Sequence, residues 1–141
     1  MSDLVLGENL SRGGKTFDKL LELRDVADGA ETATAAETGI AFAVKKFLGL
    51  LCVVYVTAID ATTGDESYVL SVEVAATVGG SYTVVSQLPN IRAAGTGIYK
   101  IALDGALAAK LLSTAAFVRI NATLAGTTPS ITYGAYLAYE S

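Results

Sequence analysis

Apolar and polar side chains alternate in both arms of the segment from Phe117 to Tyr139. The apolar positions are Val118, Ile120, Ala122 and Leu124 in the first arm, and Ile131, Tyr133, Ala135, Leu137 and Tyr139 in the second. A period of two is typical of a strand with one buried face and one solvated face. The arms flank the polar segment Ala125 to Ser130, so the pattern predicts a β-hairpin with that segment at its tip. Two strands alone are not stable, and the rest of the chain must supply more sheet.

The most apolar stretch, Phe42 to Ile59, predicts a strand that is central in a sheet or covered on both sides. Its residues from Leu50 to Val56 are apolar on both faces and rich in β-branched side chains. The apolar run Phe47 to Ile59, flanked by Lys46 and Asp60, covers 13 residues and is too short to cross a bilayer as a helix, which needs about 20 residues. We therefore expect no membrane-spanning segment here.

Further strands are predicted over 68–78, 82–88 and 98–103, each with alternating apolar residues. Turn signals separate them: Asp60 to Asp65 with Gly64, the Gly79-Gly80 pair, and Pro89-Asn90. The segment from Thr16 to Arg24 fits a helical turn or a strand, and we assign it to a strand. Asp28 to Gly39 has no apolar period and is interpreted as a loop.

One short helix is expected near residues 104–113, where Asp104 can cap its start. Leu107, Leu111 and Leu112 would form its apolar stripe. With seven or eight strands at regular spacing, the chain is predicted to be all-β, an antiparallel β-sandwich or barrel, with a jelly roll as the preferred form. Residues 1–15 are expected to be a flexible N-terminal arm, and residues 16–141 a single β-sandwich domain.

The amino-acid composition excludes several kinds of catalytic and binding site. The 141 residues include no His and one Cys, so catalysis and metal binding based on His are excluded within one chain. Cys52 lies in the most apolar run and is interpreted as a core residue. A net charge of −4 argues against sequence-independent nucleic-acid binding. The opening MSDLVLGENL has no basic region, and no secretory signal is expected.

Three clusters are candidate binding or catalytic sites. Arg12 to Thr16 resembles the end of a phosphate-binding loop but lacks its first Gly, because Asn9 stands there. The acids Asp60, Asp65 and Glu66 suggest a calcium loop or an acid pair, yet a solvated turn is the better interpretation. Seven tyrosines could form a stacking platform, although a rim around a β core is more common. We therefore expect no enzyme activity, no catalytic residue, no cofactor and no metal.

Longer sequence segments of the chain resemble the cement (decoration) proteins of tailed-phage capsids of the Bordetella-phage type. These are VTAIDATTGDESYVLSVEVA at 56–75 and FVRINATLAGTTPSITYGAYLAY at 117–139, with FDKLLELRDV at 17–26 and ETATAAETG at 31–39 similar to the first strand and loop of that family. The resemblance covers residues 17–139, and Arg119 to Ile131 is its most specific part.

The resemblance implies a jelly-roll β-sandwich that binds the exterior of an icosahedral virion capsid, across joints between subunits of the major capsid protein. It also implies a homodimer, made in the host cytoplasm. From the net charge and the short apolar run, we expect no nucleic-acid or membrane partner. Candidate contacts are the apolar patch Leu4, Val5 and Leu6 in the arm, and Thr127, Thr128 and Pro129 at the hairpin tip. The alternative is a carbohydrate- or receptor-binding β-sandwich on a phage tail or fibre.

Overall fold

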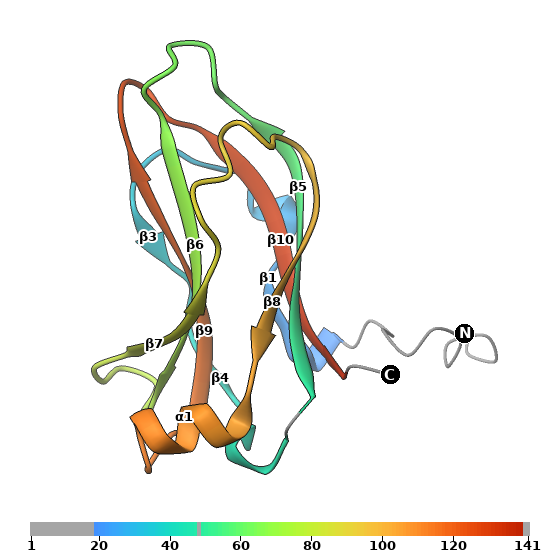
Figure 1. Ribbon diagram of the computed structural model, residues 1–141, viewed down its shortest axis with the longest axis vertical. Coiled ribbons are helices and arrows are strands. Elements are labelled where there is room, and N and C mark those ends of the chain that lie inside the picture. The colour runs from blue at the N-terminus through green and yellow to red at the C-terminus, as the bar shows by residue number, and fades with distance from the viewer. Residues whose placement is uncertain (1–18, 48, 140–141) are drawn as a thin grey trace, which may run out of the picture.

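Two antiparallel sheets pack face to face in the computed structural model, which describes residues 19–47 and 49–139 (Figure 1). Sheet A holds β1 (Glu22–Arg24), β2 (Ala30–Glu31), β5 (Leu50–Ile59), β8 (Gly97–Leu103) and β10 (Ile131–Tyr139). Sheet B holds β3 (Ala35–Ala36), β4 (Ile40–Ala41), β6 (Ser67–Ala75), β7 (Thr83–Gln87) and β9 (Phe117–Ala125). The predicted all-β sandwich is confirmed.

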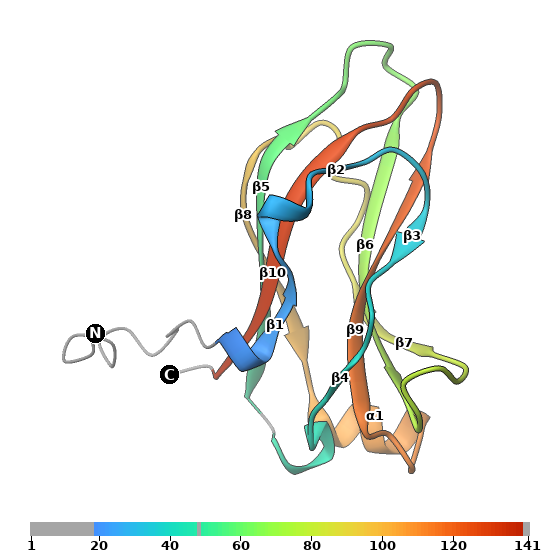
Figure 2. The same ribbon diagram turned by 180° about the vertical axis from the view of Figure 1, so that it is seen from behind.

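The strand order is β1-β10-β5-β8 in sheet A and β3-β9-β6-β7 in sheet B. β2 also pairs with β10, and β4 also pairs with β9. Seen from behind in Figure 2, the chain passes from β1 and β2 in one sheet to β3 and β4 in the other. β5 lies between β10 and β8, which confirms its predicted central position.

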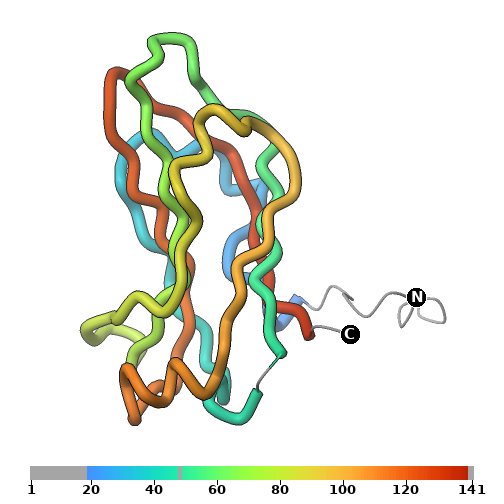
Figure 3. Tube along the Cα trace, in the orientation of Figure 1, coloured from blue at the N-terminus to red at the C-terminus, as the bar shows by residue number. Residues whose placement is uncertain are grey.

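The predicted hairpin over Phe117 to Tyr139 is wrong in one respect. Its arms are the strands β9 and β10, but they belong to different sheets: β9 pairs with β6, and β10 pairs with β5. The link 126–130 therefore crosses from sheet B to sheet A, as the tube in Figure 3 shows. Alternation specifies which face of a strand is buried, and the predicted buried faces are confirmed except at Tyr139, which is 49% exposed. Alternation does not specify the pairing partner.

The core lies between the sheets and takes the inward residues of both. Its largest fully buried apolar and aromatic side chains are Tyr68, Tyr133, Leu50, Leu70, Ile101, Leu103, Ile120, Ile131, Leu137 and Val44. Cys52 is fully buried among them, as predicted. Burial raises the pKa of its thiol to about 12, so the thiolate is suppressed near neutral pH.

The predicted helix is confirmed as α1 (Gly105–Leu111), and Asp104 caps it by accepting a hydrogen bond from the Ala106 amide at 2.9 Å. Its predicted apolar stripe is wrong for Leu107 and Leu111, which are 41% and 47% exposed, while Leu112 packs half-buried against the core. The helix instead buries Gly105 and Ala108. The Gly105 amide donates to the carbonyl of Phe47 at 2.9 Å, and a Cβ at this position would overlap that backbone. Small residues were needed for this close approach.

Several predicted boundaries also change. The structure describes ten strands, since the predicted loop 28–39 contains the short strands β2 and β3. The segment assigned to a strand before Arg24 includes the 3-10 turn η2 (Lys19–Leu21), with only β1 extended. Two more 3-10 turns are η3 (Val26–Asp28) and η4 (Val44–Lys46), and η4 interrupts the predicted strand from Phe42. β6 ends at Ala75, three residues before its predicted end.

Candidate functional site

Two loops lie side by side at one end of the sandwich (Figure 1). We call residues 60–66 and 126–130 the tip loops; each connects a strand of one sheet to a strand of the other. Thr127 joins them, because its amide donates to Asp65 Oδ1 at 3.1 Å and its hydroxyl to Asp65 Oδ2 at 2.8 Å. These bonds lower the pKa of Asp65, which stays ionised. Gly126, at φ +99°, lies directly against the Asp65 carbonyl, where a side chain would not fit.

Glu66 stabilises the loop 60–66 through hydrogen bonds within that loop. Its carboxylate accepts hydrogen bonds from the Thr63 hydroxyl, from the Thr63 amide at 3.0 Å and from the Gly64 amide at 2.9 Å. These donors, the Thr63 hydroxyl first, lower the pKa of Glu66 to about 2. The residue is 1% exposed, so the predicted solvated turn is wrong for Glu66. Gly64 has φ +90°, as its predicted turn role requires.

Tyr68 holds the base of the tip loops. Its ring is fully buried, and its hydroxyl donates to the Asp60 carbonyl at 2.5 Å while accepting from the Ser130 amide at 2.9 Å. One side chain from β6 therefore fixes both loops at their roots. The prediction that tyrosines rim the core is wrong for Tyr68 and Tyr133, which are both inside it.

The predicted contact residues divide between the tip loops and the undescribed part of the chain. Thr127 and Thr128 are exposed, and Pro129 is half-buried. Thr128 has a positive φ of 47°, an uncommon conformation for a β-branched residue, and it marks the sharp turn of the loop. Leu4, Val5, Leu6 and the predicted arm 1–15 lie outside the described residues.

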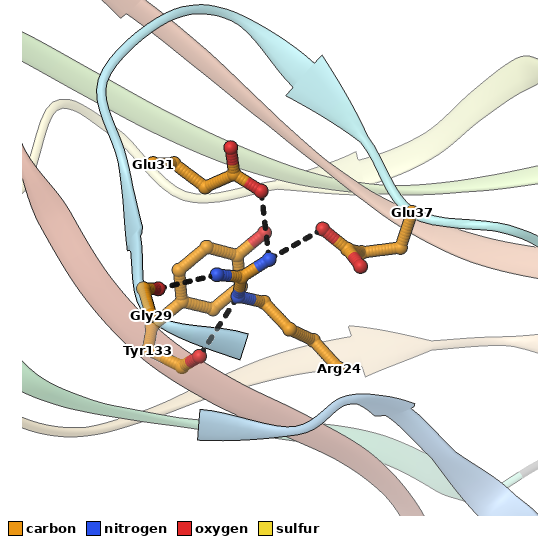
Figure 4. A network of polar contacts seen from close by, with 5 residues as sticks. All are labelled: Arg24, Gly29, Glu31, Glu37 and Tyr133. Atoms are coloured by element: carbon orange, nitrogen blue, oxygen red, sulfur yellow. Dashed lines mark hydrogen bonds and ion pairs between the residues drawn. The ribbon is translucent and has the colours of Figure 1, made fainter. Parts of the chain in front are cut away.

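A second polar cluster surrounds the buried Arg24, which is 4% exposed (Figure 4). Its Nη1 donates to Glu31 Oε2 at 2.7 Å and to Glu37 Oε2 at 2.6 Å. Its Nε donates to the Tyr133 carbonyl at 3.0 Å, and its Nη2 to the Gly29 carbonyl at 2.6 Å. The guanidinium carbon also lies 4.7 Å from the centroid of the Tyr133 ring. Arg24 thus ties β10 to the segment that crosses between the sheets.

A register shift in β1 places Arg24 there. Glu22 lies opposite Tyr136 and Arg24 opposite Ala135, so the irregularity turns both Leu23 and Arg24 inward. Burial raises the pKa of Glu37, and the hydrogen bond from Arg24 opposes that shift. Sequence analysis missed this cluster because Glu31 and Glu37 lie in a segment interpreted as a loop. The available signal was weak, because the two acids follow Arg24 only seven and 13 residues later.

These clusters close loops and hold crossing segments in place. Among residues 19–47 and 49–139, no three His, Cys, Asp or Glu side chains are grouped so that they could hold a metal ion. None of the helices in this part of the chain is long and apolar enough to cross a membrane. No known family model matches the chain, and a search of curated proteins finds no match either.

Proposed function

We propose that the protein is a structural cement protein that binds the outside of an icosahedral phage capsid and stabilises contacts between major capsid subunits. The resemblance of residues 17–139 to phage cement proteins suggests this role. The observation that supports it best is the pair of tip loops, in which Asp65, Thr127 and Tyr68 fix two crossing segments to each other. The two loops are held together by hydrogen bonds and expose Thr127 and Thr128. Such a preformed loop end can bind a surface with little loss of conformational entropy.

The strand order supports the jelly-roll form of the sandwich. From β5 onward, each step along the chain passes to the opposite sheet except the step from β6 to β7, which are consecutive and paired. The two four-stranded paths β1-β10-β5-β8 and β3-β9-β6-β7, in which β6 and β7 are the one consecutive pair, are what a double Greek key produces. We infer a jelly roll from this order.

In this proposal the partners are the major capsid protein and a second copy of the chain, on the exterior of a virion assembled in the host cytoplasm. Repeated, symmetry-matched contacts allow modest affinity for each copy. Leu4, Val5 and Leu6 would add an apolar anchor that inserts into a groove of the shell.

The test uses shells assembled from the major capsid protein of the same phage genome, with and without added protein. Decorated shells should unfold at a higher temperature than bare shells, because binding stabilises the assembly by mass action. Equal thermal midpoints at full occupancy would contradict the cement role. Deletion of residues 1–15 should lower occupancy, and unchanged occupancy would remove Leu4, Val5 and Leu6 from the contact.

A variant that keeps the hydrogen bonds between the tip loops tests whether these loops contact the shell. In Thr128→Gly/Pro129→Ala two side chains are removed, while the bonds between Thr127 and Asp65 remain and glycine tolerates the positive φ. This variant should bind shells more weakly than the wild type. The matched control is Thr114→Gly, an exposed position next to α1 at the other end of the sandwich. If both variants bind normally, the tip loops are structural only.

Carbohydrate or receptor binding is the second candidate function, and a pair of tyrosines is the feature on which it would depend. Tyr55 and Tyr136 lie side by side on the outside of sheet A, with ring centroids 6.3 Å apart. Their planes are tilted by 54°, so they do not form one flat stacking platform. Specific binding on a glycan array that is lost in Tyr55→Ala would favour this second function.

A further inference from the structure

The end of the sandwich that carries α1 is positively charged, although the chain has a net charge of −4 (Figure 1). We call segments 41–47 and 104–116 the α1 end; they meet where the Phe42 amide donates to the Ala116 carbonyl at 3.0 Å. The α1 end contains a single acid, and its basic residues are Lys45, Lys46 and Lys110. The tip loops, at the opposite end, contain three acids and no basic residue. The two ends of the molecule therefore differ in the sign of their charge.

The lysine charges of the α1 end are not neutralised within the described part of the chain. Lys46 and Lys110 are exposed and form no ion pair there. Lys45 donates to the carbonyl of Ser113, an uncharged acceptor that does not cancel its charge. The one acid, Asp104, accepts the capping hydrogen bond of α1. A negatively charged partner can therefore form ion pairs at this end without breaking an existing one.

A groove of about 550 Å³ lies beside Lys45 and Lys46. Its other lining residues come from both segments of the α1 end and are Ala41, Phe42, Ala43, Thr114, Ala115 and Ala116. Four of these six residues are alanines, so the groove is mainly apolar and its walls are made of small side chains. An aliphatic side chain that enters the groove is removed from water together with the alanine methyl groups.

The outward face of α1 adds exposed leucines to the same end. Leu107 and Leu111 lie four residues apart and are neighbours on this face, while Gly105 and Ala108 are buried. Lys110 follows Leu107 by three residues and lies beside it. The sequence thus contains an apolar stripe that the core does not cover, next to a positive charge.

We propose that the α1 end binds an acidic segment of a partner protein. An aliphatic side chain of that segment occupies the groove, and its carboxylates pair with the surrounding lysines. Complementary charge steers the segment to this end and away from the acidic tip loops. Burial of apolar surface supplies most of the affinity, because exposed ion pairs contribute little. This binding surface needs no shell, and it goes beyond the proposed function.

Other partners fit the charges less well. Surfaces that bind anionic lipids or nucleic-acid phosphates usually have four or more clustered basic residues. The α1 end has three, and the chain as a whole is acidic. The tip loops of a second copy contain acids, but the carboxylates of Asp65 and Glu66 already accept hydrogen bonds within their own chain. An acidic segment with free carboxylates is therefore the occupant that the charges favour.

Two-dimensional NMR of the isotope-labelled full chain tests the proposal with the peptide acetyl-Glu-Glu-Leu-Leu-Glu-Glu-amide. The amides of Lys46 and Ala116 should shift with saturation, at a dissociation constant of about 0.1 to 1 mM. One control peptide has Gln in place of Glu, and another has Ser in place of Leu. Each should bind about tenfold more weakly, because one lacks the charges and the other the apolar side chains. Absence of saturable shifts, or equal binding of all three peptides, overturns the proposal.

Charge reversal tests the lysines of the α1 end. Lys46→Glu should weaken binding of the acidic peptide about fivefold. Lys100→Glu makes the same change of charge at an exposed position in the middle of β8, and it should leave binding within about twofold of the wild type because salt screens distant charges. Equal effects of the two variants would show that only the net charge matters and would overturn the proposed site.

A second pair of variants tests the groove. Ala116→Leu fills it and should remove the preference for the Leu peptide over the Ser peptide, whereas Ala61→Leu, exposed in a tip loop, should keep that preference. Thermal unfolding checks that each variant is folded. Unchanged preference in both variants would exclude the groove as the binding site. Thr114→Gly keeps every lysine and alanine of the groove, so it remains a control for the shell test.

Two further measurements identify the other occupants. Co-sedimentation of the chain with phosphatidylserine vesicles, without binding of the acidic peptide, would overturn the proposal in favour of a lipid surface. Shifts of the Lys46 and Ala116 amides on dilution without peptide would show a second copy at this end and would also overturn it. Because no shell is used, this test can fail while the shell test succeeds, and the reverse.

Discussion

The outward side chains of the two sheets make different kinds of contact. On sheet B, Arg119 of β9 bonds to Glu73 of β6 at 2.6 Å. The Tyr82 ring covers the guanidinium at 3.8 Å, and its hydroxyl donates to the Val78 carbonyl at 2.9 Å. Glu73 is 7% exposed as a result. Sheet B therefore satisfies its outward charged groups with side chains of the same chain.

On sheet A, the corresponding surface is built from apolar and aromatic side chains. Tyr55 lies over Gly134, so closely that a Cβ there would overlap the ring. Val53 and Leu51 point outward beside it and are 5% and 9% exposed. The ion pair between Glu22 and Lys19 lies at the edge strand β1 and does not join neighbouring strands as the pair between Glu73 and Arg119 does.

The difference shows two ways of burying outward residues. On sheet B, an ion pair and an aromatic ring satisfy and cover the charged groups. On sheet A, the outward Leu51 and Val53 are 9% and 5% exposed, so apolar side chains are removed from water there. Both faces are thus expected to contribute to stability, sheet B through polar contacts and sheet A through apolar contacts.

The largest expected effect is the loss of the ion pair on sheet B. Arg119→Met leaves the nearly buried Glu73 carboxylate without its partner and removes the contact with Tyr82. We expect the free energy of unfolding, measured in urea, to fall by about 2 to 3 kcal/mol. Glu73→Leu/Arg119→Met removes both charges and should recover part of this loss. A single variant as stable as the wild type would mean that sheet B does not depend on the pair.

A matched pair of glycines compares the aromatic cover of the two faces. Gly134→Ala on sheet A should destabilise the fold by about 1 to 3 kcal/mol, because the new Cβ overlaps the Tyr55 ring against the sheet. Gly39→Ala on sheet B meets only the hydroxyl end of Tyr82. Lifting that ring from Arg119 should cost about 0.5 to 1 kcal/mol.

Urea unfolding of both glycine variants measures these effects, and ring truncation provides the control. Tyr55→Ala/Gly134→Ala should be no less stable than Tyr55→Ala alone, since the overlap is gone. If Gly134→Ala still destabilises when the ring is absent, its cost comes from the strand backbone and not from the aromatic cover.

Much of the fold was predictable because it depends on local patterns. The buried faces of β9 and β10, the central β5 and the Asp104 cap follow from spacing within a few residues. Sheet membership was not predictable in this way, because it depends on pairing between strands far apart in the sequence. The supposed hairpin failed for that reason.

The polar clusters could not be predicted either, because their contacts also join residues far apart in the sequence. Arg24 contacts the Tyr133 carbonyl, 109 residues away, and Thr127 contacts Asp65, 62 residues away. Their residue types were visible, but their contacts depend on a register shift in β1 and on crossing loops. Thr127 was proposed as a partner contact, and the structure shows that its hydroxyl is already bonded within the chain.

The smallest expected effect concerns the electrostatic field that Glu22 and Asp25 exert on Tyr55 of sheet A. Burial raises the pKa of Tyr55, and the nearby carboxylates of Glu22 and Asp25 raise it further. A tyrosine pKa above its unfolded value of about 10 contributes stability below that pH, and the contribution is lost as pH rises through the folded pKa. Tyr55→Phe should therefore lose less stability at alkaline pH than the wild type.

Glu22→Gln removes one of those negative charges and should move the pKa of Tyr55 back toward its unfolded value. Absorbance at 295 nm, taken as the difference from the matching Tyr55→Phe variant, isolates this tyrosine. Asp28→Asn, an exposed acid on η3, serves as the control and should leave the Tyr55 titration unchanged. If Glu22→Gln also leaves it unchanged, the Glu22 carboxylate does not act on Tyr55 across sheet A, and burial alone raises the pKa of this tyrosine.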